Sequence, residues 1–155
     1  MLTEKEREEI EEQIGQCHDK RGAIGEALRI VQRHRRWISD ESLRDVADFL
    51  ELTEEEVEHV ATFYSLIFRR PVGRHVIQIC DSVSCWIMGY RPLLEHLRAR
   101  LGNIQLGETT RDDRFTLLPV GCLGACDQAP ALMIDDDLHT RLTAETIDLI
   151  LEKYP

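Results

Sequence analysis

Four of the five cysteines in this 155-residue chain fall in two short pairs. Cys80 and Cys85 form a C-x4-C pair, and Cys122 and Cys126 form a C-x3-C pair. Each pair follows a short β-like run, so we expect both pairs to lie in loops just beyond strand ends. If the two strands are neighbours, both loops open on the same edge of the sheet and the four sulfurs can converge.

Two pairs of thiolates suit a cluster that contains two irons. Each iron of a 2Fe–2S cluster is tetrahedral and takes two bridging sulfides and two thiolates, so two separated pairs offer one pair per iron. Gly121 and Gly124 flank Cys122 and permit tight turns. We expect their N–H groups to approach the sulfurs, where hydrogen bonds raise the reduction potential. A helix starting near Trp86 is expected to point its positive end at the cluster.

Other kinds of cysteine site fit the same pattern less well. Zinc also takes four tetrahedral thiolates, and pairs spaced by three or four residues are compatible with it. Dithiol redox enzymes usually carry Cys-x-x-Cys, which neither pair has. A zinc-stabilised interaction domain without a redox role is therefore the alternative from a different functional class.

The net charge and the N-terminal segment limit the classes of binding partner and the cellular compartment that we expect for this chain. A net charge of −10 argues against non-specific nucleic-acid binding, which depends on basic patches. The chain lacks an apolar run of about 18 residues, and its acidic beginning lacks the apolar core of a secretory signal. We therefore expect a cytoplasmic chain whose thiols stay reduced.

The N-terminal part, residues 1–72, shows helical spacing of apolar side chains and is expected to form a bundle of short helices. A threonine followed three residues later by glutamate predicts a capping box at two helix starts, Thr3 with Glu6 and Thr53 with Glu56. The first of these helices is expected to continue to about residue 17. Two further helices are expected over about 21–37 and from near Asp40 to residue 50.

In the C-terminal part, residues 73–155, short β-like runs alternate with helices, which suits a small mixed sheet with helices packed on it. The expected elements are strands over 75–79, 115–120, 131–134 and 139–142, one helix with Ile87 and Leu101 on its apolar face, and a last helix capped by Thr143. The last two strands flank residues 135–137, three aspartates, and are expected to form a hairpin. Pro119 suggests that the end of the second strand is not a central rung of the sheet. The change of pattern near Pro71 and Gly73 predicts domains 1–72 and 73–155.

Several other residues fit structural roles. Cys17 is interpreted as a plain thiol, and His75 and His139 are not expected as ligands because four cysteines are already available. The basic cluster 33–36 is interpreted as a solvated helix face or as a docking patch on a partner. Trp86 is interpreted as a packing residue or as a shield that keeps water from the cluster.

The two cysteine pairs, followed by Ala129-Pro130, resemble the small thioredoxin-like 2Fe–2S subunit of bacterial NADH:quinone oxidoreductase, respiratory complex I. Stretches 60–65, 71–75 and 133–139 are similar to that subunit as well. The resemblance covers nearly the whole chain and includes all four cysteines of the two pairs.

This resemblance implies an α+β fold, with an N-terminal helical bundle attached to a thioredoxin-like domain that has a small mixed sheet. It implies one 2Fe–2S cluster held by Cys80, Cys85, Cys122 and Cys126. NADH and FMN would bind a flavoprotein partner, with other peripheral-arm subunits of complex I alongside. The chain would exchange single electrons with that FMN, on the cytoplasmic side of the inner membrane.

The residues agree with a role as one subunit of an enzyme. No G-x-G-x-x-G follows a predicted strand, so we do not expect a complete active site on this chain alone. The same cysteine motif also fits the small diaphorase subunit of an NAD-linked hydrogenase or formate dehydrogenase, which is kept as the alternative host.

Overall fold

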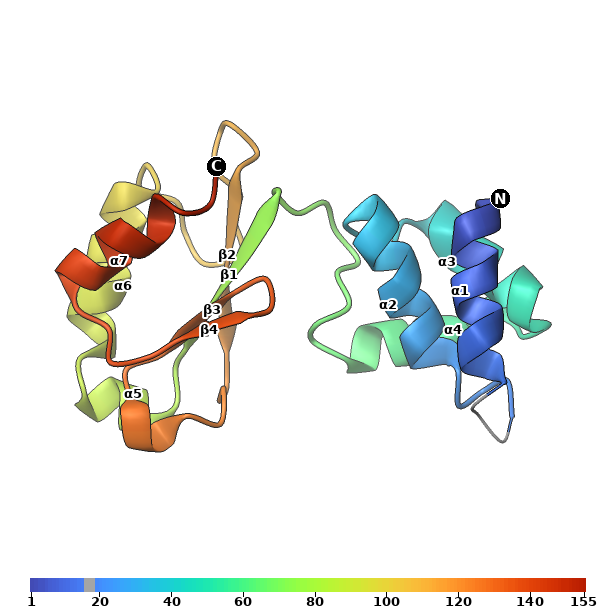
Figure 1. Ribbon diagram of the computed structural model, residues 1–155, viewed down its shortest axis with the longest axis horizontal. Helices are drawn as coiled ribbons and strands as arrows, with labels where there is room; N and C mark the ends of the chain where they lie inside the picture. The colour runs from blue at the N-terminus through green and yellow to red at the C-terminus, as the bar shows by residue number, and fades with distance from the viewer. Residues whose placement is uncertain (16–18) are drawn as a thin grey trace. The chain divides into compact units, whose positions relative to one another are not determined.

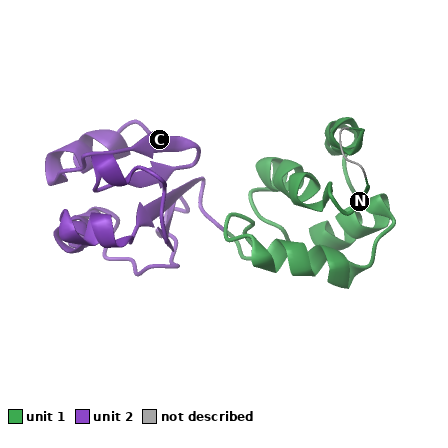
Figure 2. Ribbon diagram, turned by 90° about the horizontal axis from the view of Figure 1, so that it is seen from below, with its two compact units in different colours: residues 1–71 green, residues 72–155 purple. Residues whose placement is uncertain are grey.

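The computed structural model describes residues 1–15 and 19–155. They divide into two compact units, Met1–Pro71 and Val72–Pro155 (Figure 2). Within these residues the first unit is helical and the second is built on a four-stranded mixed sheet (Figure 1), which confirms the expected α+β fold. Every helix in the described ranges is too short or too polar to cross a membrane.

The helical unit is a bundle whose members are α1 (Glu4–Ile14), α2 (Ile24–Arg35), α3 (Asp40–Leu50) and α4 (Glu54–Phe63). Both predicted capping boxes are present, because each threonine hydroxyl accepts an N–H from the first helical turn while the glutamate returns to the threonine N–H. Ile10, Leu28 and Val46 are fully buried where the apolar faces of α1, α2 and α3 contribute to one core.

Helix α1 is shorter than predicted. It ends at Ile14, with Gly15 as its C-cap, and the predicted end near residue 17 lies outside the described residues. Glycine ends helices readily because it loses more conformational freedom in a helix than other residues do. The interpretation of Cys17 lies outside the described residues.

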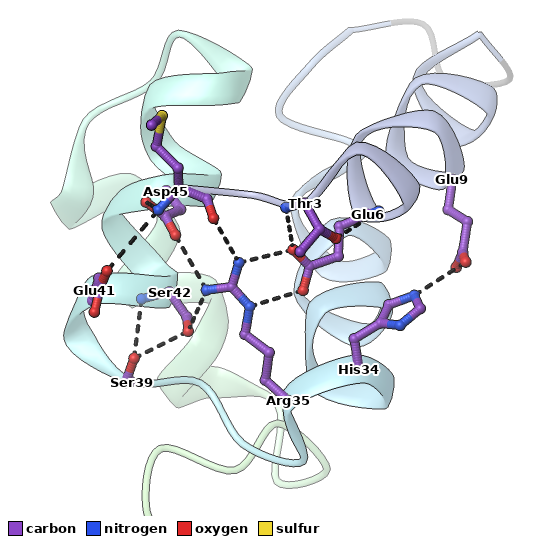
Figure 3. Close-up of polar contacts among 10 residues, drawn as sticks. Thr3, Glu6, Glu9, His34, Arg35, Ser39, Glu41, Ser42 and Asp45 are labelled. Carbon is purple, nitrogen blue, oxygen red and sulfur yellow. Dashed lines mark hydrogen bonds and ion pairs between the residues drawn. The ribbon is translucent and has the colours of Figure 1, made fainter.

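Arg35 of the basic cluster 33–36 is part of the fold (Figure 3), whereas the other three residues of the cluster are exposed, which agrees with a solvated helix face, and a docking role stays a prediction. Arg35 donates to both carboxylate oxygens of Glu6 at 2.8 Å. The same guanidinium donates to Ser42 Oγ and Asp45 Oδ2 at 3.1 Å. These contacts connect α1, α2 and α3, and Arg33 and His34 add a contact with Glu9 of α1.

Glu6 is the most deeply buried member of this network, with 1% of its surface exposed. Burial raises the pKa of its carboxyl, but hydrogen bonds from Arg35 and Thr3 outweigh that effect and lower the pKa to about 2. A residue predicted only to cap a helix therefore also serves as the anion of a buried ion pair.

The sheet has the strand order β2-β1-β3-β4. Strand β1 (His75–Cys80) pairs in parallel with β2 (Phe115–Val120) and antiparallel with β3 (Leu132–Ile134), and β3 pairs antiparallel with β4 (Asp137–His139). Strand β2 is at the edge of the sheet, so its end at Pro119 is not a central rung, as expected from a residue that has no N–H for a second ladder.

The predicted hairpin is present, but its last strand is displaced. Strand β4 covers Asp137–His139 and not 139–142, so the connecting turn consists of Asp135 and Asp136 alone. Asp135 has a φ of 53°, a left-handed conformation that aspartate tolerates better than most residues do in short turns.

Helices α6 (Tyr90–Arg100) and α7 (Ala144–Leu151) lie on one side of the sheet (Figure 1). Leu97 of α6 and Ile147 of α7 are buried there in one core with Ile77 of β1. Thr143 caps α7, as predicted. This layer of side chains holds the sheet from which the cysteine loops emerge.

The prediction of a single helix after Cys80 is wrong. Two helices are present, α5 (Val83–Ile87) and α6, separated at Gly89, which has a φ of +112° that favours glycine. Because the chain changes direction there, Ile87 is 79% exposed and does not join the buried face of α6.

The segment between the units is anchored on both sides. Arg69 donates to Asp40, to Glu58 and to the carbonyl oxygen of Ile38, all within the helical unit. The Gly73 N–H donates to Thr116 Oγ1 at 2.7 Å within the sheet unit. Residues 70–72 therefore lie between the two anchors.

Candidate functional site

The parallel pairing of β1 and β2 brings the two cysteine loops to the same edge of the sheet. Cys80 is the last residue of β1, and it pairs with Val120, the last residue of β2. Just beyond them, the N–H of Asp81 donates to the Val120 carbonyl at 3.0 Å. The expectation that both loops open on one edge, which depended on the two strands being neighbours, is confirmed.

The first sulfur pair is buried. Cys80 is 3% exposed and Cys85 is 2% exposed, and both pack with Ala129 and Ala131. Cys85 lies in the first turn of α5, whose N-cap is Ser82. The helix therefore begins at Val83, three residues earlier than predicted, and the alignment of its positive end with a cluster stays a prediction.

The second sulfur pair is exposed to solvent. Cys122 and Cys126 have their sulfurs 3.6 Å apart. The Gly124 N–H donates to Cys122 Sγ at 3.3 Å, and the φ of +77° at Gly124 is one that glycine adopts without strain. The predicted approach of a glycine N–H to a sulfur is thus present at Gly124, while a similar role for Gly121 stays a prediction.

The two loops meet at Cys80. Burial raises the pKa of this thiol, but the Ser82 hydroxyl and the backbone N–H groups of Ser82 and Leu123 act on its sulfur and bring the pKa below its ordinary value. Leu123 belongs to the second loop, between Cys122 and Cys126. Its N–H therefore joins the second loop to the first sulfur pair.

The pKa of the Cys85 thiol is shifted in the opposite direction, above its ordinary value. Burial raises the pKa of its thiol, and the neighbouring Cys80 raises it further. A donor from the other side, the Ala131 N–H, only partly offsets these effects. The first pair thus contains one sulfur that is stabilised as a thiolate and one that needs a further positive partner to become one.

The chemistry of the donor set fits a cluster with two irons, because it offers thiolates in two pairs. Across residues 1–15 and 19–155, no three side chains of His, Cys, Asp or Glu lie close enough together to hold one metal ion, so the convergence of all four sulfurs stays a prediction. A 2Fe–2S cluster takes its four thiolates two per iron, as two pairs at one edge can supply them. A structural zinc site instead gathers four ligands around a single ion.

The two histidines of the sheet unit have other partners. His75 opens β1, about 16 Å along the strand from Cys80 at the usual rise per residue, and its Nδ1 lies 2.7 Å from Asp135 Oδ2. His139 Nε2 lies 3.0 Å from the hydroxyl of Tyr154. These contacts agree with the expectation that the sulfurs, and not the histidines, form the site.

Trp86 is 46% exposed. Its ring stacks on Tyr90 with 5.5 Å between the centroids, and the Arg91 guanidinium lies 4.8 Å from its centroid. These contacts with the start of α6 fit the packing interpretation.

Sequence reasoning missed the groups that act on the buried sulfurs. Ser82 precedes Cys85 by three residues, and such a spacing from serine to the third helical residue is the usual signal of an N-cap. That signal was available in the sequence. The N–H groups of Leu123 and Ala131 could not be identified from the sequence. Every residue except proline has a main-chain N–H, and only the folded structure determines which ones lie near a sulfur.

Comparison with known proteins connects this geometry to a family. The model of the thioredoxin-like [2Fe-2S] ferredoxin family matches residues 10–155. The chain is 52% identical over 153 residues to a subunit of the NADH-quinone oxidoreductase of Escherichia coli (strain K12), covering 99% of this chain and 92% of that protein. It is 49% identical over 154 residues to the corresponding protein of Pseudomonas aeruginosa, with the same coverage of both chains.

A solved structure is similar as well. The crystal structure of NAD+-reducing [NiFe]-hydrogenase in the air-oxidized state matches 82% of this chain with a TM-score of 0.71 and 31% sequence identity. The matched region makes up 22% of that hydrogenase chain, so this chain spans only about a fifth of its length.

Proposed function

Because the chain belongs to the thioredoxin-like [2Fe-2S] ferredoxin family, we propose that it carries single electrons in the NADH dehydrogenase module of NADH:quinone oxidoreductase. Its residues fit one 2Fe–2S cluster, with the ligands Cys80, Cys85, Cys122 and Cys126. When bound, the cluster supplies reversible one-electron transfer. The observation that carries the proposal is that both cysteine loops emerge at one sheet edge, where Leu123 of the second loop packs against the buried pair Cys80 and Cys85.

The chain's own residues hold the site and set its surroundings. The buried pair, Cys80 and Cys85, provides a side from which water is excluded, because both sulfurs lie among Ala129, Ala131 and partly buried apolar neighbours. The exposed pair leaves the opposite side accessible to an electron donor. One buried and one open side suit a carrier that exchanges electrons with a group on another subunit.

The partner in this proposal is the flavoprotein subunit that binds NADH and FMN, together with the other subunits of the peripheral arm. The likeness over 92% of the length of the NADH-quinone oxidoreductase relatives supports it. No complete active site is assigned to this chain alone. We also propose that the chain reaches the cytoplasmic side of the inner membrane through the complex, and that the division near residue 72 separates a docking domain from a cluster domain.

An aromatic pair on the helical unit supports the docking role. Phe63 at the end of α4 is 79% exposed and Tyr64 is 54% exposed, with their rings edge to face at 5.1 Å. Exposed aromatic residues are enriched in protein interfaces. The double substitution Phe63→Ala with Tyr64→Ala should weaken co-purification of the flavoprotein without loss of iron. Leu149→Ala, which removes an exposed apolar side chain of the other unit, is the matched control.

The cluster itself is tested by metal and sulfide analysis of anaerobically purified protein, together with low-temperature EPR after reduction by dithionite. We expect iron and acid-labile sulfide in the proportion of one 2Fe–2S cluster per chain and an EPR signal from a single unpaired electron. Stoichiometric zinc without iron or sulfide would overturn the proposal and establish the zinc-stabilised domain.

The likeness to the hydrogenase chain favours a second host, in which this chain is the small diaphorase subunit of an NAD-linked hydrogenase. Purification of the assembly through a tag on this chain separates the two hosts. Co-purifying NADH:quinone activity supports the first host, whereas co-purifying hydrogen-dependent reduction of NAD+ replaces it with the second.

A further inference from the structure

Ser82 lies between the two buried cysteines of the site. Its Oγ is 3.3 Å from Cys80 Sγ and 3.5 Å from the N–H nitrogen of Cys85, for which it acts as the N-cap of α5. Among the hydrogen bonds of the described residues, Ser82 is the only side chain other than cysteine that contacts a cysteine sulfur.

The direction of the hydrogen bond follows from what each atom can offer. The Ser82 hydroxyl has one hydrogen and two lone pairs, and a lone pair accepts the Cys85 N–H. A free thiol at Cys80 can donate to the hydroxyl. A cysteine that binds iron has lost its proton and can only accept, so the Ser82 hydroxyl becomes the donor to Cys80 Sγ.

We propose that Ser82 is a positioning residue that raises the reduction potential of the cluster through its hydroxyl hydrogen bond to Cys80 of the buried sulfur pair. This inference rests on the proposed function. Reduction brings one electron from the donor to the cluster and breaks no bond in the protein. The added negative charge is shared by the ligand sulfurs, so a donor stabilises the reduced state more than the oxidised state.

The surroundings increase the effect of this hydroxyl. Cys80 is 3% exposed, and a hydrogen bond is electrostatically stronger in such a site than in water. The other donors to sulfur in the two loops, at Gly124 and Leu123, are main-chain N–H groups that a side-chain substitution leaves in place. Ser82 is therefore a donor that can be removed while the rest of the site is kept.

Four variants of the full chain test the proposal. Ser82→Ala removes both the donor and the helix cap, whereas Ser82→Gly removes the donor and leaves a residue that is tolerated at a helix N-cap. Ser82→Thr keeps both. Ser84→Ala is the matched control, because it removes a hydroxyl from the same helix that makes no side-chain hydrogen bond in the described part of the chain.

The readouts are iron and sulfide content and the midpoint potential from an EPR-monitored redox titration. We expect full clusters in all variants and a fall of about tenfold in the equilibrium constant for reduction in Ser82→Ala and Ser82→Gly. Tenfold corresponds to about 59 mV for a one-electron couple. Ser82→Thr and Ser84→Ala should keep the wild-type potential.

An unchanged potential in fully loaded Ser82→Ala and Ser82→Gly would overturn the inference while leaving the proposed function intact. Loss of the cluster from both variants, with Ser82→Thr loaded, would also overturn it, since the hydroxyl would then serve assembly and not tuning. Wild-type protein without iron and sulfide would instead show that the proposed function has failed.

Discussion

The helical unit and the sheet unit treat their buried polar groups differently. In the helical unit, Arg35 contacts Glu6, Ser42 and Asp45, so the buried carboxylate finds its counter-charge inside the fold (Figure 3). In the sheet unit, N–H and hydroxyl donors act on the sulfurs, yet Cys122 and Cys126 stay exposed.

The difference separates stability from function. A buried group whose partner lies in the same unit contributes to folding, and its loss leaves an uncompensated charge. The sulfurs at the sheet edge accept hydrogen bonds but have no positively charged side chain among the hydrogen bonds of the described residues. They are therefore available as ligands of a metal cluster. Polar contacts therefore stabilise the fold of the helical unit, whereas in the sheet unit they arrange the sulfurs for a cluster.

Each unit carries one of the chain's two tryptophans, Trp37 and Trp86, which makes the comparison measurable. In a Trp86→Phe background, fluorescence reports unfolding of the helical unit. In a Trp37→Phe background, the fluorescence of Trp86 reports unfolding of the sheet unit, and a bound cluster is expected to quench that fluorescence.

The largest expected effect is in the sheet unit. Replacing any one of its four paired cysteines by alanine should remove nearly all iron, because a 2Fe–2S cluster needs four ligands. The midpoint of unfolding reported by Trp37 should not change. Iron and sulfide analysis measures the first effect, and Cys17→Ala, outside both pairs, is the control. Loss of iron from Cys17→Ala would show that the ligand set is wrong.

The next largest effect is in the helical unit. Arg35→Ala should lower its free energy of unfolding by about 3 kcal/mol, because it leaves the Glu6 carboxylate buried without its partner. Chemical denaturation followed through Trp37 measures the change, and iron content should stay at the wild-type level. Arg44→Ala breaks an exposed pair with Glu54 and should cost far less, because water screens that pair. Equal losses in the two variants would contradict the internal network.

The pH dependence of stability sharpens the same contrast. The pKa of Glu6 is about 2 in the folded chain against an ordinary value of 4.5, so the unfolded chain binds more protons between these values. The contribution of Glu6 is present above pH 4.5 and is lost as the pH falls toward 2. From pH 5 to pH 3 the loss should be about 2 kcal/mol. The measurement compares wild type with Glu6→Gln, whose stability should fall less over this range by that amount.

The smallest effect compares two glycines. A Cβ at Gly73 would lie 3.0 Å from backbone atoms of Asp113, Arg114 and Phe115, so Gly73→Ala should destabilise the sheet unit by about 1 kcal/mol or more. A Cβ at Gly25 in α2 meets no atom within 4 Å, so Gly25→Ala should stabilise the helical unit by about 0.5 to 1 kcal/mol. Denaturation followed through the tryptophan of each unit tests both signs.

Features that depend on neighbouring residues could be predicted from the sequence. The capping boxes at Thr3 and Thr53 and the start of the last helix after Thr143 are confirmed, because a cap involves residues only three positions apart. The expectation from Pro119 that the end of β2 is not a central rung is confirmed, because β2 lies at the edge of the sheet. The two cysteine spacings indicated a paired-thiolate site before any strand was placed.

Predictions failed where a local pattern had more than one continuation. The apolar residues after Cys85 repeat like those of one helix, but Gly89 divides them into two. The three aspartates of the hairpin mark a turn, yet only its pairing with β3 decides that Asp137 belongs to the strand. In each case the chain had two local solutions of similar free energy, and packing selected one.

The sequence by itself determined the four loop cysteines and the acidic helical bundle, because side-chain chemistry and helix capping depend on residues that are close together in the sequence. Only the tertiary structure decided that β1 and β2 pair in parallel, that Leu123 packs against the buried cysteine pair, and that Glu6 meets Arg35. The physical reason is distance along the chain. Contacts between residues far apart in sequence depend on the cooperative packing of whole elements, which no local pattern contains.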